Sequence, residues 1–174
     1  MTRAEVLHVL RAAVAITGHR EWVAVGSQAL ALWFVARPPI LARSQEIDLY
    51  APGQDAFTEL AEGSLGEGSL FQDTFGYYAH GVGEDTAVFP SAWPTRAQRF
   101  AIEPYSDAVV VVPSPADLAV AKLLAFRDKD LDFVETMLSE GMVTATELAR
   151  GLGDLDRSVP DALVRQAMGW VRAR

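Results

Sequence analysis

A short apolar run enters a tight turn at Trp22-Val23-Ala24-Val25-Gly26-Ser27-Gln28. Residues 22–25 are mostly strand formers, so they predict a buried β-strand. Gly26 has no side chain, which permits a tight turn and a close approach of another group to the backbone. Residues 28–35 then favour a helix, which Pro38-Pro39 ends. The stretch therefore predicts a strand, a small-residue turn and a helix in that order.

A second strand is predicted at Glu46-Ile47-Asp48-Leu49-Tyr50, where polar and apolar residues alternate. Residues two apart on a strand point to the same face, so Glu46 and Asp48 project together, about 7 Å apart along the chain. Carboxylate oxygens are the ligands that Mg²⁺ or Mn²⁺ prefers. A pair of metal ions about 4 Å apart is the usual arrangement for phosphoryl transfer. Glu46 and Asp48 are therefore candidate catalytic residues and metal ligands.

The turn between these two strands offers groups that suit a phosphate. The start of the following helix presents free backbone N–H groups, which favour an anion. Ser27 adds a hydroxyl donor, and Gly26 leaves the backbone accessible. Gly26 and Ser27 are therefore candidate nucleotide-binding residues.

The rest of the chain predicts an α/β (α+β) fold with a mixed β-sheet flanked by helices. Thr2 and Glu5 form a capping box for a first helix, which Gly18 can end. We expect a short helix over 56–62, a glycine-containing loop over 63–69, and further strands over 75–82, 87–89, 99–103 and 108–112. The last of these strands is nearly all valine, which predicts burial on both faces.

The C-terminal third is predicted to be helical. Capping boxes at Ser114/Asp117, Thr144/Glu147 and Ser158/Asp161 mark three helix starts. We therefore divide the chain into an α/β domain over 1–112 and a helical segment over 113–174 that packs on it.

The composition limits the classes of function. The chain has 174 residues, no cysteine and a net charge of −8. Nine acids and no Lys or Arg fall between Ser44 and Pro90, so we do not expect a general DNA- or RNA-coating role, although a local basic patch elsewhere could hold one nucleotide. The lack of cysteine excludes a thiolate zinc site and a cysteine nucleophile. The N-terminus does not resemble a secretory signal and no apolar run has membrane-spanning length, so we expect a cytoplasmic protein with no membrane partner.

The order of these motifs resembles the nucleotidyltransferase fold of the DNA polymerase beta superfamily. The longer resemblance is to a bacterial family of unknown function described as nucleotidyltransferase-like, which is related to the AbiEii-like toxins of toxin–antitoxin systems. The residues that carry it are Val25-Gly26-Ser27-Gln28-Ala29, Arg43-Ser44-Gln45-Glu46-Ile47-Asp48-Leu49-Tyr50, Gly66-Glu67-Gly68-Ser69, Gly76-Tyr77-Tyr78-Ala79-His80-Gly81-Val82, Pro90-Ser91-Ala92-Trp93, Asp117-Leu118-Ala119-Val120-Ala121-Lys122 and Arg127-Asp128-Lys129-Asp130.

The resemblance implies Mg-dependent transfer of a nucleoside monophosphate from a nucleoside triphosphate to an RNA, protein or small-molecule acceptor. It implies that Gly26 and Ser27 hold the triphosphate and that Glu46 and Asp48 hold Mg²⁺ or Mn²⁺. It also implies a toxin role, with a cognate antitoxin as partner. Arg43 and Ser44 belong to the same motif and are candidate nucleotide-binding residues.

Three cations in the C-terminal segment are further candidates for phosphate binding. Lys122 shares the apolar stripe of its helix, so its amine either reaches a phosphate or extends to solvent. Arg127 and Lys129 either neutralise a triphosphate or form an ordinary charge cluster at a helix end.

The sequence departs from the superfamily in its acids. Glu46 stands where the first aspartate is usual, and the strand expected to carry a third carboxylate offers His80, with Glu84 and Asp85 beyond it. A histidine can act as a general base, so His80, Glu84 and Asp85 are candidates to orient or deprotonate the acceptor. Two alternatives remain open: a catalytically inactive nucleotide-binding or protein-interaction module on the same fold, and a regulator that contacts DNA or protein through its C-terminal helices.

Overall fold

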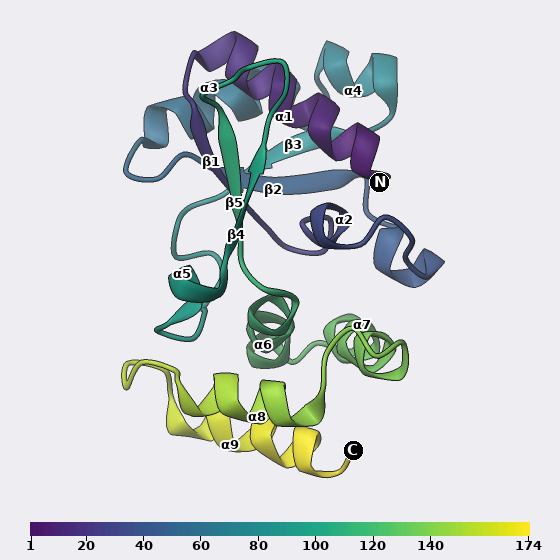
Figure 1. Cartoon of the computed structure of the whole chain (residues 1–174), viewed down its shortest axis with the longest axis vertical. Helices are drawn as coiled ribbons and strands as arrows, with labels where there is room; N and C mark the ends of the chain where they lie inside the picture. Colours follow the sequence, from purple (N-terminus) through teal and green to yellow (C-terminus); the bar gives the residue numbers. More distant parts are fainter. The chain divides into compact units, whose positions relative to one another are not determined.

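A computed structural model describes all 174 residues, which form two compact units (Figure 1). The first unit comprises residues 1–86 and 98–112, and the second comprises residues 87–97 and 113–174. The mixed sheet flanked by helices confirms the predicted α+β class. None of the helices has both the length and the apolar character that a membrane span requires.

The first unit is built on one five-stranded sheet with the strand order β3-β2-β1-β5-β4. β1 is antiparallel to β2 and parallel to β5, β2 is parallel to β3, and β4 is antiparallel to β5. The strands are β1 (Glu21–Val25), β2 (Glu46–Tyr50), β3 (Tyr78–Gly81), β4 (Gln98–Ala101) and β5 (Val109–Val112).

Helices connect these strands and cover one face of the sheet. They are α1 (Arg3–Thr17), α2 (Leu30–Trp33), the 3₁₀ helix η1 (Pro39–Ala42), α3 (Asp55–Leu65) and α4 (Leu70–Phe75). The capping box of Thr2 and Glu5 begins α1, and Gly18 ends it in the left-handed conformation, as predicted.

The two faces of β2 and β3 differ in character. Ile47, Leu49 and Ala79 are at most 1% exposed, on the face that the buried sides of α1 and α3 cover. Glu46 and Asp48 alternate with these residues and lie on the opposite face, where both are partly exposed. The apolar packing therefore fixes which side of the sheet the two carboxylates occupy.

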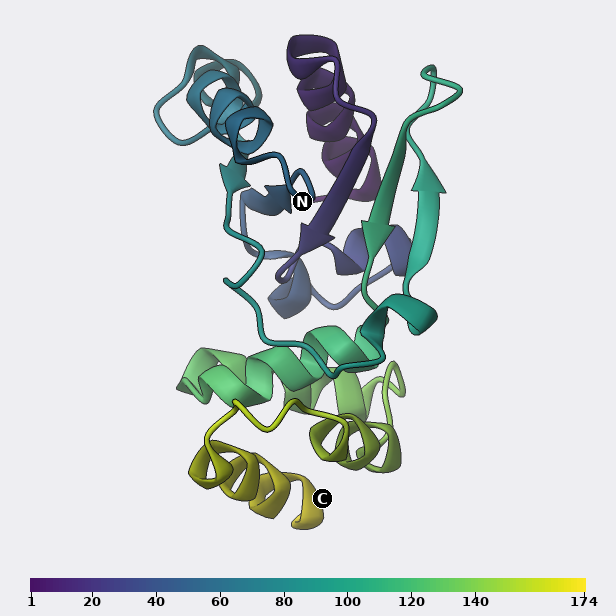
Figure 2. The same cartoon turned by 90° about the vertical axis from the view of Figure 1, so that its left-hand side faces the viewer.

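The second unit is helical (Figure 2). Its helices are α5 (Trp93–Arg96), α6 (Pro115–Ala125), α7 (Asp128–Ser139), α8 (Ala145–Gly153) and α9 (Asp161–Arg172). α6 packs against α7, α8 and α9, and its core includes Leu123, Met137, Leu148 and Leu152.

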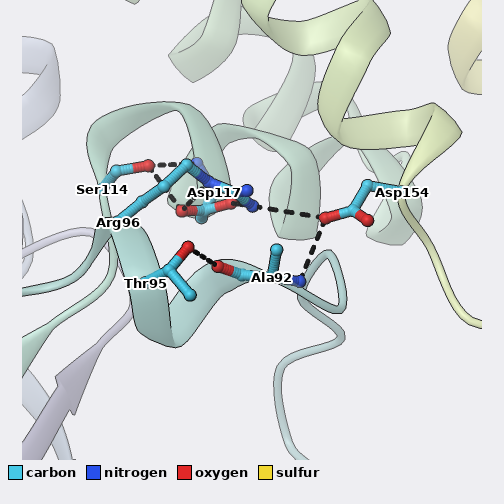
Figure 3. Close-up of polar contacts among 6 residues, drawn as sticks. All are labelled: Ala92, Thr95, Arg96, Ser114, Asp117 and Asp154. Carbon is cyan, nitrogen blue, oxygen red and sulfur yellow. Dashed lines mark hydrogen bonds and ion pairs between the residues drawn. The ribbon is translucent and has the colours of Figure 1, made fainter.

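A polar cluster ties the segment 87–97 to α6 within the second unit (Figure 3). Asp117 is 1% exposed and accepts hydrogen bonds from Arg96 Nη2 at 2.6 Å and Nε at 3.2 Å. Ser114 donates its hydroxyl to the same carboxylate at 2.5 Å. Asp154 accepts the backbone N–H of Ala92 at 3.0 Å and lies 3.6 Å from Arg96 Nη2. The buried acid is thus paired and hydrogen-bonded, as burial of a carboxylate requires.

Several predicted elements differ from the structure in the first unit. The helix expected over 28–35 is reduced to α2, because residues 26–29 form turns and Phe34 is already extended. The loop expected over 63–69 begins as the last turn of α3, where burial of Leu65 offsets the weak propensity of Gly63. Residues 70–75 form α4, with Ser69 as its N-cap and Gly76 as its left-handed C-cap, so the strand expected over 75–82 begins at Tyr78.

Two further differences lie in the second unit, and one lies in β5. Residues 87–89 form no strand, and Val88 is 44% exposed. Ser158 does not cap α9, because its own backbone N–H binds Asp156 and Pro160 occupies the N-cap position. In β5 only the alternate valines Val110 and Val112 are buried, so the expected burial on both faces is wrong.

Candidate functional site

The turn after β1 lies directly beside Asp48. Val25 pairs with Asp48 across the antiparallel ladder, so Gly26 follows at the neighbouring position. Gly26 has a φ of +70°, and a Cβ built on it would lie 1.9 Å from Asp48 Oδ2. Only glycine meets both demands, the left-handed backbone and the contact. The close approach expected at Gly26 is made in this structure by the carboxylate of Asp48.

β3 presents a hydrogen-bond donor directly opposite each carboxylate of β2. In the parallel register Glu46 pairs with Tyr78 and Asp48 pairs with His80. The Tyr78 hydroxyl donates to Glu46 Oε2 at 3.0 Å, and His80 Nδ1 lies 2.8 Å from Asp48 Oδ1. These four side chains form one polar group on the open face, which we call the β2–β3 cluster.

Charge within the β2–β3 cluster shifts the pKa values of its donors. Partial burial alone lowers the pKa of His80, but the hydrogen bond with Asp48 and the negative charges of Asp48, Glu46 and Glu62 outweigh it, so this pKa lies above 6.5. Burial, together with the hydrogen bond to Glu46 and nearby carboxylates, raises the pKa of Tyr78 to about 12. Tyr78 therefore remains a hydroxyl donor at neutral pH.

The raised pKa of His80 predicts a measurable titration in the metal-free protein. Asp48→Asn removes the largest favourable charge, so the pKa of His80 is expected to fall from its raised position toward 6.5. Because the folded-state value is raised, the stability that this pair contributes is complete below 6.5 and is lost as pH rises through the folded pKa. Imidazole C–H shifts followed by NMR against pH check the first point, and urea unfolding at several pH values checks the second. An unchanged imidazole titration in Asp48→Asn contradicts the prediction.

The other predicted residues of the first unit have different surroundings. Ser27 Oγ accepts a hydrogen bond from the Gln28 side chain at 3.3 Å. Ser44 Oγ accepts the backbone N–H of Glu46 at 3.2 Å, so Ser44 helps to begin β2. Arg43 is exposed at the end of η1.

Glu84 and Asp85 lie in the turn after β3, away from Glu46. Glu84 Oε1 accepts the backbone N–H of Gly53 at 2.5 Å, beyond the C-terminal end of β2. Asp85 is exposed in the same turn. Of the three residues predicted to act on an acceptor, the structure therefore brings His80 into contact with Asp48, and Glu84 contacts a different loop.

The predicted cations Lys122, Arg127 and Lys129 belong to the second unit. Asp130, which is 1% exposed, binds Lys122 Nζ at 3.2 Å and Arg127 Nε at 2.5 Å. Burial alone raises the pKa of Asp130, but the bonds and charges of Arg127 and Lys122 lower it below its ordinary value. Lys122 and Arg127 thus hold a buried acid between α6 and α7. Their contribution to phosphate binding, and that of the exposed Lys129, stays a prediction.

Sequence reasoning missed Tyr78 as a member of the site. The signal was present, because Tyr78 and His80 stand two apart on a strand, like Glu46 and Asp48. Matching the two pairs requires the parallel register, which the sequence pattern does not contain.

The donor set is suited to a magnesium ion that arrives with phosphate. No group of three or more His, Asp or Glu side chains is arranged to hold a metal ion. Mg²⁺ usually binds through one or two carboxylates and completes its coordination with water and substrate phosphates. Glu46 and Asp48, on one face beside the Gly26 turn, meet that requirement.

Comparison with known proteins identifies one family. A family model described as "Nucleotidyltransferase of unknown function (DUF6036)" matches residues 4–150. That range includes all of the first unit except Met1–Arg3 and most of the second. No curated protein matches the sequence, and no solved structure does.

Proposed function

The chain belongs to this family of nucleotidyltransferases, and we propose that it transfers a nucleoside monophosphate from a Mg²⁺-bound nucleoside triphosphate to an acceptor hydroxyl. The single observation that carries the proposal is the contact between Asp48 and Gly26. It brings a carboxylate that would bind the metal ion beside the turn that would hold the phosphates.

In this proposal Glu46 and Asp48 would hold a Mg²⁺ ion. When bound, the ion would supply positive charge that offsets the charge developing on the phosphate oxygens. Gly26 and Ser27 hold the β- and γ-phosphates through the turn. The acceptor oxygen forms a bond to the α-phosphorus, the bond to the β-phosphate oxygen breaks, and pyrophosphate leaves. The acceptor proton passes to His80 Nε2 or to water, since His80 Nδ1 is engaged with Asp48.

Charge favours some acceptors over others. The first unit carries thirteen of the 23 carboxylates but six of the 15 basic residues. Such a surface repels polyanions, whose binding needs Lys and Arg. Among RNA, protein and small-molecule acceptors, we therefore favour a protein or small-molecule hydroxyl.

The test is label transfer by the full chain. Wild type is incubated with each α-labelled nucleoside triphosphate, Mg²⁺ or Mn²⁺, and separate pools of RNA, protein and small molecules. We expect transfer by wild type and its loss in Asp48→Asn. Asp55→Asn removes the same charge from the exposed start of α3 and should retain activity. The absence of both nucleotide binding and transfer in wild type would overturn the proposal.

A second candidate is a nucleotide-binding module without catalysis. It is favoured by the β3 partners of the two carboxylates, which are Tyr78 and His80 and include no third acid. Wild type that binds a nucleoside triphosphate but releases no pyrophosphate would support this candidate over the first.

We also propose a toxin role, which rests on the resemblance to AbiEii-like toxins of bacteria. Induced expression in a bacterial host is expected to arrest growth, and Asp48→Asn is expected to relieve the arrest. Relief of growth by the product of a neighbouring gene would identify the antitoxin. Equal growth with wild type and Asp48→Asn would contradict the toxin role and leave the transfer reaction unaffected.

A further inference from the structure

In the β2–β3 cluster each carboxylate is paired with one side chain that can donate a hydrogen bond while uncharged. Tyr78 reaches Glu46 at 3.0 Å and His80 reaches Asp48 at 2.8 Å, both across the same parallel ladder. Each bond fixes one carboxylate oxygen and thereby the rotation of the carboxylate about its own axis. A pair of such bonds at matching positions sets both carboxylates in one arrangement.

We propose that Tyr78 and His80 are positioning residues, which orient Glu46 and Asp48 to receive a divalent cation. This inference rests on the proposed function, because it assigns the ion to those two carboxylates. It identifies β3 as the strand that orients the metal ligands. The sequence alone does not indicate this role for a tyrosine or a histidine.

The tautomer of His80 follows from its partner. A carboxylate oxygen only accepts, so Nδ1 carries the hydrogen that binds Asp48 Oδ1. A second hydrogen on Nε2 is not needed for this bond. Nδ1–H therefore serves as the donor in both the neutral and the charged ring, and the positioning role does not depend on the protonation of Nε2.

These hydrogen bonds are partly exposed to solvent, so stabilising the fold does not by itself explain them. The His80 side chain is 47% exposed and that of Asp48 is 23% exposed. Solvent-exposed polar pairs of this kind contribute little to stability. Loss of partners that orient metal ligands, by contrast, typically costs about 10–100-fold in metal affinity. A structural role and a positioning role therefore predict different outcomes.

The test measures Mn²⁺ affinity, by electron paramagnetic resonance of the free ion, in the full chain with and without a non-hydrolysable nucleoside triphosphate. Tyr78→Phe and His80→Ala are expected to weaken Mn²⁺ binding about 10–100-fold. His80→Asn should restore it, because the Asn side-chain amide lies where Nδ1–H was. Tyr77→Phe is the matched control, since the Tyr77 hydroxyl makes a bond of 2.8 Å to His8, outside the cluster.

The free energy of unfolding of each variant is measured in urea as well, and we expect it to differ little from that of wild type. The inference is wrong if the Mn²⁺ affinity of wild type exceeds that of Tyr78→Phe and of His80→Ala by twofold or less. That result leaves the proposed function intact. If His80→Asn weakens Mn²⁺ binding as much as His80→Ala does, His80 is not a positioning residue, because a hydrogen-bond donor at this place then does not restore binding. Wild type that binds no Mn²⁺ even with the nucleotide overturns both proposals.

Discussion

Gly26→Ala is expected to destabilise the first unit and to abolish nucleotide binding. A φ of +70° costs an alanine about 1–2 kcal/mol. The new Cβ would also lie 1.9 Å from Asp48 Oδ2, so the carboxylate must move, and such overpacking costs roughly 1–3 kcal/mol more. Urea unfolding measures the stability, and binding of a fluorescent nucleoside triphosphate with Mn²⁺ measures the site.

Gly18 provides a matched control for backbone strain. Its φ of +71° is almost the same, but nothing lies within 4 Å of a Cβ built there. Gly18→Ala should therefore show the cost of the left-handed backbone alone and retain nucleotide binding. Asp48→Ala makes room for the new methyl group, so Gly26→Ala should cost less in that background, with a coupling of about 0.5–3 kcal/mol. An equal loss of stability from Gly26→Ala in wild type and in Asp48→Ala would show that residue 26 does not contact Asp48.

Arg96→Ala is expected to cause a large loss of stability in the second unit. Asp117 is 1% exposed, and the substitution leaves its carboxylate with Ser114 as the remaining side-chain donor in the cluster of Figure 3. Breaking a buried ion pair typically costs 3–5 kcal/mol, and we expect about 2–3 kcal/mol because the Arg96 side chain is 38% exposed. Urea unfolding and hydrogen exchange of the α6 amides measure the effect.

Arg165→Ala is the control for the charge itself. Arg165 lies 4.0 Å from Asp161 on α9, and both side chains are mostly exposed. Its removal should change stability by less than about 0.5 kcal/mol. A similar small effect of Arg96→Ala would show that Asp117 does not need its partner.

Local signals predicted most of the secondary structure. The capping boxes at Thr2 and Thr144 and the Ser114 cap mark the starts of α1, α8 and α6. The donor and the acceptor of each capping hydrogen bond lie within a few residues of each other, so the local sequence is enough to predict the bond. Ser158 shows the limit, because a neighbouring aspartate competes for the same backbone and Pro160 takes the cap position.

The candidate site was predictable in part for the same reason. Glu46 and Asp48 share a face through the period of a single strand. The partners of these carboxylates depend on which strands pair and in which register, and residues 78 and 80 lie 32 positions away along the chain. The Glu84 contact with Gly53 joins two loops whose approach depends on the whole sheet.

The path of the chain limits how the protein can be dissected. The chain leaves the first unit after Thr86, returns at Gln98 and leaves again after Val112. A fragment that stops at residue 112 would carry the excursion 87–97 without the helix that binds Arg96. Isolation of the sheet by genetic truncation therefore requires replacing that excursion with a short linker as well as removing the tail. Limited proteolysis has the same constraint, because a single cut between the two units leaves a piece of one unit covalently attached to the other.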